Sequence, residues 1–167
     1  MTYNTVNLCG EIDDSLTERV CRQLKESAKF SEEVLLYIDS PGGFSDCMQQ
    51  IIETIKNLGV PVWGYVIGEG ASAAFNIWQY CERRFVSRGA SLLFHRGRYT
   101  PENNPQFAML FWEPCVFTSE GEYDEEIYRL MSEKSGLSID DIRRLAEEEF
   151  SPSPVEAVLL GLADQII

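Results

Sequence analysis

Short apolar runs that end in glycine or small polar residues alternate along this chain with segments of helical periodicity. The runs at 34–39 and 61–67 have the length and composition of buried strands. The helix between them is predicted from one apolar face, formed by Met48, Ile51, Ile52, Ile55 and Leu58. A strand, a helix and a second strand in this order predict a β-α-β crossover unit. The chain is therefore expected to adopt an α/β fold.

The same alternation continues on both sides of this unit. Strands are expected near 6–9, at 84–87, at 91–94 and at 164–167. Helices are expected from about Ser15, where Leu16, Val20 and Leu24 share a face, and at 73–81, 123–135 and 138–148. Residues 99–118 are polar and then rich in aromatic side chains, with prolines, and no element is predicted for them.

The clearest helix boundary lies near the C-terminus. Ser153 is predicted as an N-cap, with Pro154 at the first helical position and Glu156 as the reciprocal capping-box partner. Ser138 is a second predicted N-cap, and Gly161 suits the end of the last helix. These residues indicate that helices continue almost to the last residues.

Composition limits the number of domains and the class of partner. The 167 residues are 44% apolar, which fits one domain, residues 1–167, with a buried core. The net charge of -13 disfavours phosphate backbones and anionic lipid as partners. No apolar stretch approaches the roughly 20 residues that span a bilayer, and the first residues do not resemble a signal peptide. We therefore expect a cytoplasmic protein that binds neither nucleic acid nor membrane.

Five cysteines are spread widely along the chain: Cys9, Cys21, Cys47, Cys81 and Cys115. They form no Cys-x-x-Cys pair, and a single histidine cannot complete a zinc set, so no metal or other cofactor is expected. Cys81 or Cys115 is a conceivable nucleophile with His95 as its base, but neither lies in a glycine-rich turn. We interpret the cysteines as reduced packing residues.

Three motifs together indicate nucleophilic chemistry. His95, the only histidine, ends an apolar run, and Ser72 lies among the small residues of 68–74. A third motif, the Ser-Pro-Gly-Gly turn at 40–43, ends a predicted strand upstream of both. Taken singly, each is typical of a turn or a packing residue. A serine hydroxyl is a weak nucleophile and needs a base within hydrogen-bonding reach. In combination, the three motifs supply a serine and a histidine that could act as its base.

A serine nucleophile also needs donors for the oxyanion that forms when it attacks a carbonyl. A helix beginning just after Ser72 would place unpaired N–H groups and the positive end of its dipole beside the hydroxyl. The N–H of Ala73 is one candidate donor and that of Gly43 is the second. Small neighbours such as Gly70 and Ala74 would let the two backbone segments approach closely.

These motifs resemble those of the proteolytic subunit of the Clp protease, a serine peptidase with a crotonase-like β-α spiral. The turn at 40–43 is similar to the Ser-Pro-Gly-Gly of that family, 68–74 resembles its nucleophile motif, and His95 resembles its strand-terminal histidine. The segment 156–164 is similar too, so the resemblance covers most of the chain. It implies a ClpP-like α/β spiral in one domain with a helical handle region. The site residues it implies are Ser72 as nucleophile, His95 as base, and Gly43 and Ala73 as oxyanion donors.

The third triad residue of the family, an aspartate, corresponds to the glutamates at 147–149. Counting back without gaps from Glu156 selects Glu149, whereas aligning Phe150 with the phenylalanine that follows the family aspartate selects Glu148. A glutamate can orient a histidine and stabilise its imidazolium if the backbone accommodates the extra methylene. Both glutamates are candidates for the third triad position.

The resemblance also implies partners: a peptide or unfolded-protein substrate, a homo-oligomeric ring, and an AAA+ unfoldase. The chain reaches its first predicted strand within about five residues. The N-terminal arm that gates the axial pore in the family is thus expected to be missing, which weakens the expectation of an unfoldase. The segment after His95 lacks the glycine-glutamine motif of the family handle, so substrate binding and ring stacking are expected to differ.

We therefore predict a serine-type endopeptidase that hydrolyses peptide bonds through an acyl-enzyme. One alternative is a catalytically silent ring subunit, suggested by the glutamate at the third triad position. The other is a crotonase-like enzyme that acts on acyl-coenzyme A thioesters and uses the same backbone donors to stabilise an enolate. The ordered pair of Ser72 and His95 argues against the second alternative.

Overall fold

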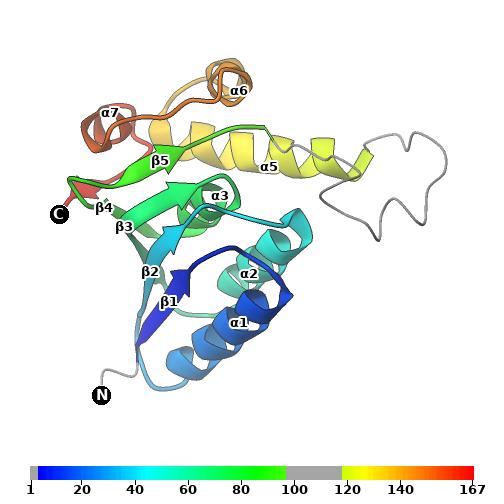
Figure 1. The fold of residues 1–167 in the computed structure, drawn as a ribbon, viewed down its shortest axis with the longest axis vertical. Coiled ribbons are helices and arrows are strands. Elements are labelled where there is room, and N and C mark those ends of the chain that lie inside the picture. The colour runs from blue at the N-terminus through cyan, green and yellow to red at the C-terminus, as the bar shows by residue number, and fades with distance from the viewer. Residues whose placement is uncertain (1–3, 97–117) are drawn as a thin grey trace.

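A six-stranded sheet forms the centre of the computed structural model, which describes residues 4–96 and 118–167 (Figure 1). The strands are β1 (Thr5–Cys9), β2 (Val34–Ser40), β3 (Val62–Ala71), β4 (Arg83–Val86), β5 (Ser91–Leu93) and β6 (Gln165–Ile166). Their order is β1-β2-β3-β4-β6, and every pairing is parallel. The long β3 pairs with β4 along its first half and with β5 along its last three residues. The predicted α/β class is confirmed.

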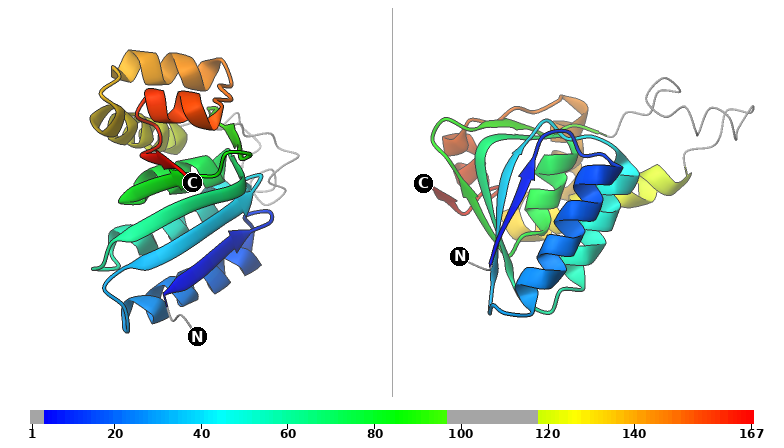
Figure 2. Two further views of the ribbon diagram at one scale, coloured as in Figure 1. Left: turned by 90° about the vertical axis from the view of Figure 1, so that its left-hand side faces the viewer. Right: turned by 60° about the horizontal axis from the view of Figure 1, so that its bottom comes forward.

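The helices form two groups around this sheet. They are α1 (Asp14–Ala28), α2 (Ser45–Lys56), α3 (Ala73–Tyr80), α5 (Thr118–Ser135), α6 (Ile139–Glu147) and α7 (Pro154–Leu159). The first three lie on one face of the sheet, with α2 packed between α1 and α3 (Figure 2). The last three lie together at the end of the molecule away from the N-terminus. Nearly all of the segment 99–118, for which no element is predicted, lies outside the described residues.

The structure differs most from the prediction in the length of β3, which continues from the predicted end at 67 to Ala71. Its glycines suggest a turn by sequence, but β5 pairs with Glu69–Ala71 and keeps this segment extended. The Asp39 carboxylate accepts the Glu69 N–H at 2.8 Å and occupies the space where Gly68 has no side chain. Two segments distant in sequence thus hold a glycine-rich stretch in the sheet. The helix α5 also begins earlier than predicted, at 118 rather than 123.

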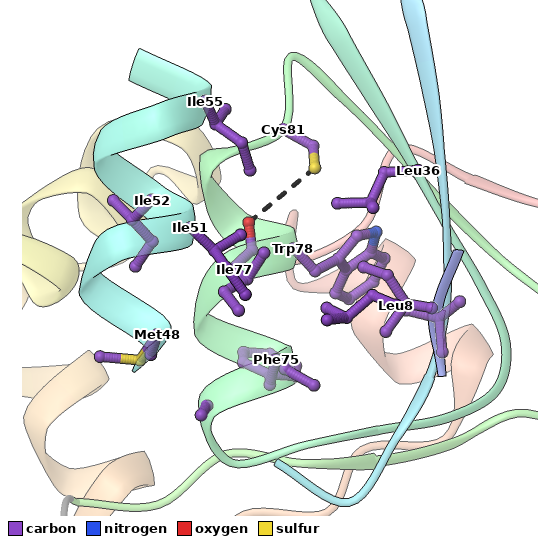
Figure 3. Packing of buried hydrophobic residues seen from close by; sticks show 14 of the residues in the cluster. Leu8, Leu36, Met48, Ile51, Ile52, Ile55, Phe75, Ile77, Trp78 and Cys81 are labelled. Atoms are coloured by element: carbon purple, nitrogen blue, oxygen red, sulfur yellow. Dashed lines mark hydrogen bonds between the residues drawn. The ribbon is translucent and has the colours of Figure 1, made fainter. Parts of the chain in front are cut away.

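Trp78 joins the helical layer to the sheet. Its indole is fully buried beside Leu8 and Leu36 of the strands (Figure 3), and its Nε1–H donates to the Gly64 carbonyl oxygen at 3.2 Å. A Cβ on Gly64 would lie 2.7 Å from both the indole and the Cys81 sulfur. A glycine is therefore required near the start of β3 for α3 to pack this closely. Because α3 follows Ser72 directly, this packing also fixes the position of the turn at Ser72.

A buried arginine joins β4 to the C-terminal strand. The Arg84 guanidinium donates to Asp164 at 2.8 Å and to the Gln79 side-chain oxygen at 2.9 Å. The Arg84 N–H also donates to Asp164, at 2.6 Å. Burial alone would raise the pKa of Asp164, but these hydrogen bonds and the adjacent positive charge outweigh it and hold the pKa below its ordinary value. The pair therefore stabilises the end of the sheet best when Asp164 is ionised.

Both predicted N-caps are confirmed. The Ser138 side chain accepts the Asp141 N–H at 3.1 Å, at the start of α6. At the start of α7, the Ser153 side chain accepts the Glu156 N–H at 3.3 Å while the Glu156 carboxylate accepts the Ser153 N–H at 2.8 Å. These caps hold α6 and α7 where the chain returns to the sheet, next to the segment that follows β5.

Candidate active site

Ser72 occupies a sharp turn between β3 and α3. Its backbone has φ 55° and ψ -122°, a conformation that residues other than glycine rarely adopt. Such strain costs about 1–3 kcal/mol and persists only where the surroundings impose it. Here the Ser72 N–H donates to the Leu93 carbonyl oxygen at 2.8 Å, which pins the turn to β5. This strained turn between a strand and a helix places the half-buried Ser72 at the carboxyl end of β3.

His95 follows the same strand, β5, and is brought next to Ser72. Its Nε2 lies 2.8 Å from the Ser72 Oγ, and its Nδ1 lies 2.7 Å from the main-chain carbonyl oxygen of Arg96. Since a carbonyl can only accept, the hydrogen bond to Arg96 requires a proton on Nδ1. The neutral imidazole then has its lone pair on Nε2, where it can accept the serine hydroxyl proton. The predicted nucleophile and base are therefore within hydrogen-bonding distance.

The glycine turn at 40–43 lies against the turn at Ser72. Gly42, at φ 98°, has no side chain where a Cβ would come 2.8 Å from the Ala71 oxygen and from the Ser72 Cβ. The turn is held from the other side by Ile12, whose N–H donates to the Gly42 oxygen at 2.8 Å. A Cβ on Gly43 would overlap the backbone of Ile12. Both glycines are thus needed for three backbone segments to meet.

The two predicted oxyanion donors lie on these two turns. Ala73 is the first residue of α3, and its N–H precedes the first intrahelical hydrogen bond of that helix. Within residues 4–96 and 118–167, the N–H of Gly43 donates no backbone hydrogen bond, although its neighbour Phe44 donates to Ile12. One donor on each of two adjoining turns would suit an oxyanion. Their role remains a prediction.

The glutamates predicted for the third triad position lie at the end of α6. Glu148 is the C-cap residue of α6, and Glu149 follows at φ 53°. An isolated antiparallel bridge pairs Phe94 with Phe150, so His95 and Glu149 each adjoin a residue of this bridge. The two hydrogen bonds of the His95 imidazole within the described residues go to Ser72 and to Arg96. A triad role for either glutamate therefore stays a prediction.

The described residues give little support to other chemistry. Burial raises the pKa of Cys81 to about 12, so its thiol is a poor nucleophile at neutral pH, while Cys115 lies outside the described residues. Among the residues that are described, no group of three or more histidine, cysteine or acidic side chains could hold a metal ion. In the same part of the chain, no helix is both long and apolar enough to cross a membrane.

The structure adds three main-chain contributors that sequence reasoning does not find. Ile12 pairs with the glycine turn, Phe150 accepts the Phe94 N–H at 2.8 Å, and the Arg96 carbonyl accepts from His95. Every residue carries the same main-chain carbonyl, so no residue type marks these positions. Only the pairing of distant segments identifies them.

Comparisons with known proteins identify the family and the fold of this chain. A family model described as Clp protease matches residues 1–167. The chain is 38% identical to ATP-dependent Clp protease proteolytic subunit 2 of Treponema denticola over 93 residues, which span 53% of this chain and 46% of that protein. It is 26% identical to the corresponding subunit 2 of Treponema pallidum over 96% of this chain and 80% of that protein. Among solved structures, ClpP1 from Listeria monocytogenes has a TM-score of 0.80 at 26% identity, covering 99% of this chain and 91% of that one.

Proposed function

We infer that this chain, which belongs to the Clp protease family, is a serine-type endopeptidase that cleaves peptide bonds through an acyl-enzyme. The resemblance and the ClpP-like fold predicted from the sequence are both confirmed by the family match and the solved structures. Family membership supports a peptidase over the alternative that acts on acyl-coenzyme A thioesters. The serine mechanism rests on one observation, the 2.8 Å contact between Ser72 Oγ and His95 Nε2.

In the proposed mechanism, the Ser72 Oγ attacks the carbonyl carbon of a peptide while its proton passes to His95 Nε2. His95 then gives this proton to the leaving amine as the carbon–nitrogen bond breaks. Water, deprotonated by the same nitrogen, hydrolyses the acyl-enzyme and restores the serine. The Nδ1–H tautomer supports each of these steps because it leaves Nε2 free to accept the first proton.

The developing oxyanion is assigned to the N–H groups of Gly43 and Ala73. Support comes from the close contact of the two turns and from the position of Ala73 at the start of α3. Donors of this kind are fixed before the reaction and need no reorganisation as charge develops. Removing one such donor typically costs about 10²–10³-fold in kcat.

Of the two glutamates predicted for the third triad position, we favour Glu149, because it adjoins Phe150, which bridges to the residue before His95. Its left-handed backbone is unusual for a residue other than glycine or asparagine after a helix. Strained positions of this kind cluster at functional sites, which supports a role for Glu149 near the histidine.

Labelling with a fluorophosphonate tests the proposed nucleophile directly. The reagent reacts with an activated serine whatever the peptide preference, so a single adduct on Ser72 is expected by intact mass and peptide mapping. Ser72→Ala should give no adduct, and His95→Ala should slow labelling by roughly 10²–10⁴-fold. Absence of any adduct on a folded, assembled protein would contradict the serine mechanism and favour a catalytically silent subunit.

The proposal includes a homo-oligomeric ring and, by family analogy, an AAA+ unfoldase that delivers unfolded protein. Relatives of this chain are named as subunits of an ATP-dependent protease, which supports both. Light scattering should give a mass several times the 19.0 kDa of one chain. A stable monomer would contradict the ring. Without an unfoldase, we expect the protein to hydrolyse short peptides but not folded proteins.

A further inference from the structure

We propose that the main-chain carbonyl of Arg96 is the group that orients His95 and fixes its tautomer in the resting subunit. This inference rests on the proposed serine mechanism, in which His95 is the base. It makes Arg96 a positioning residue through its backbone and assigns to a carbonyl the orienting role that a carboxylate has in a Ser-His-Asp triad.

The contact between His95 and the Arg96 carbonyl is short, and only the histidine can be its donor. The His95 Nδ1 lies 2.7 Å from the Arg96 oxygen, well within the range of an N–H···O hydrogen bond. Since the carbonyl has no proton to give, Nδ1 must carry the hydrogen. The other nitrogen, 2.8 Å from Ser72 Oγ, then accepts the hydroxyl proton. One hydrogen bond thus determines which nitrogen can act as the base.

The backbone around this carbonyl is held by its neighbours. The Phe94 N–H donates to the Phe150 oxygen at 2.8 Å, and the Arg96 N–H donates to the Ala146 oxygen at 3.1 Å. Ala146 lies in the last turn of α6, and Phe150 follows just after this helix. The Arg96 side chain also lies 3.8 Å from Asp124 of α5. Residues 94–96 are therefore fixed on both sides of His95, and the carbonyl is presented by a tethered backbone.

The protons and bonds of the first step balance with this arrangement. As the Ser72 oxygen bonds to the peptide carbon, the hydroxyl proton moves to Nε2. The imidazolium that forms still donates its Nδ1–H to the carbonyl oxygen of Arg96. The proton leaves from Nε2 when the leaving amine departs. A neutral carbonyl stabilises the imidazolium less than a carboxylate does, because it lacks the negative charge that would attract the positively charged ring. The carbonyl therefore orients the base, but it stabilises the protonated form less than a carboxylate would.

Solid-state NMR on the sedimented, assembled protein tests whether the Arg96 carbonyl is the partner of Nδ1. The method works whatever the mass of the oligomer. His95 is the only histidine, so ¹⁵N-histidine labelling gives one Nδ1 and one Nε2 signal. One sample also carries [1-¹³C]arginine and a second carries [5-¹³C]glutamate. We expect Nδ1 to be protonated and to be dephased through space by the arginine carbonyl carbon. Dephasing by a glutamate carboxyl carbon with none from arginine would overturn the assignment.

A variant pair supplies the functional arm of the same test. Glu149→Gln and Glu148→Gln remove the same charge from adjacent positions, and both should retain the Nδ1–H tautomer. A wrong histidine tautomer lowers the reaction rate roughly 10⁴-fold. The rate of fluorophosphonate labelling of Ser72 in Glu149→Gln should fall far less than this. A shift of the proton to Nε2 in Glu149→Gln, but not in Glu148→Gln, would overturn the proposal. Because the NMR is read on unreacted protein, a correct tautomer without any labelling would contradict the proposed function and leave this inference standing.

Discussion

Replacing Gly42 with alanine should both destabilise the protein and slow the reaction of Ser72. The added Cβ would lie 2.8 Å from the Ala71 oxygen and the Ser72 Cβ, and 3.0 Å from the Ala73 nitrogen. None of these atoms ends a flexible side chain, so the contact can be relieved only if the backbone of the nucleophile turn moves. The same movement would displace the serine from its base.

The expected loss has two parts that a matched variant separates. Alanine at φ 98° is strained by about 1–2 kcal/mol, and forcing a methyl group into packed backbone typically costs about 1–3 kcal/mol more. At Gly10, which has φ 95°, an added Cβ would have no neighbouring atom within 4 Å, so Gly10→Ala should lose only the first part. The free energy of unfolding should therefore fall further in Gly42→Ala, by about 1–3 kcal/mol.

Urea unfolding followed by tryptophan fluorescence measures the stability difference, and the rate of fluorophosphonate labelling measures the state of Ser72. A displacement of about 1 Å between reacting groups can cost roughly 10²-fold in rate, so labelling of Gly42→Ala should be strongly slowed while Gly10→Ala stays near the wild-type rate. Equal loss of stability in the two variants, or unchanged labelling in Gly42→Ala, would refute the close packing of the two turns.

Three further predictions concern the fold. The folded pKa of Asp164 lies below the unfolded value of about 3.9, so its contribution to stability is complete above that pH and is lost as the pH falls through the folded value. The urea midpoint of Asp164→Asn should accordingly fall less steeply with acidification than that of the wild type. Ser153→Ala removes the cap on the Glu156 N–H and should lower the free energy of unfolding by about 1 kcal/mol. Trp78→Ala should cost about 3–5 kcal/mol because the indole is fully buried. A cost as small as that of replacing the half-buried Trp63 with alanine would contradict the place of Trp78 in the core.

Much of the fold follows from side-chain pattern. The helix face of α2 and the buried strand β2 are visible as periodicity, and the capping box at Ser153 is visible as a local motif. The glycine-rich end of β3 is not, because its strand conformation depends on pairing with β5. Local preference and tertiary pairing disagree there, and the pairing prevails because it satisfies backbone groups of both strands.

The candidate site divides in the same way. Residue type and chain order alone indicated Ser72, His95 and the glycine turn, because a nucleophile, a base and a tight turn each require particular side chains or none. The tertiary structure decided that Ser72 and His95 meet at 2.8 Å and that the Nδ1 of His95 bonds to the carbonyl of Arg96. The physical reason is that every residue has the same carbonyl, and the direction in which it points is determined by how β5 and the end of α6 pair in space.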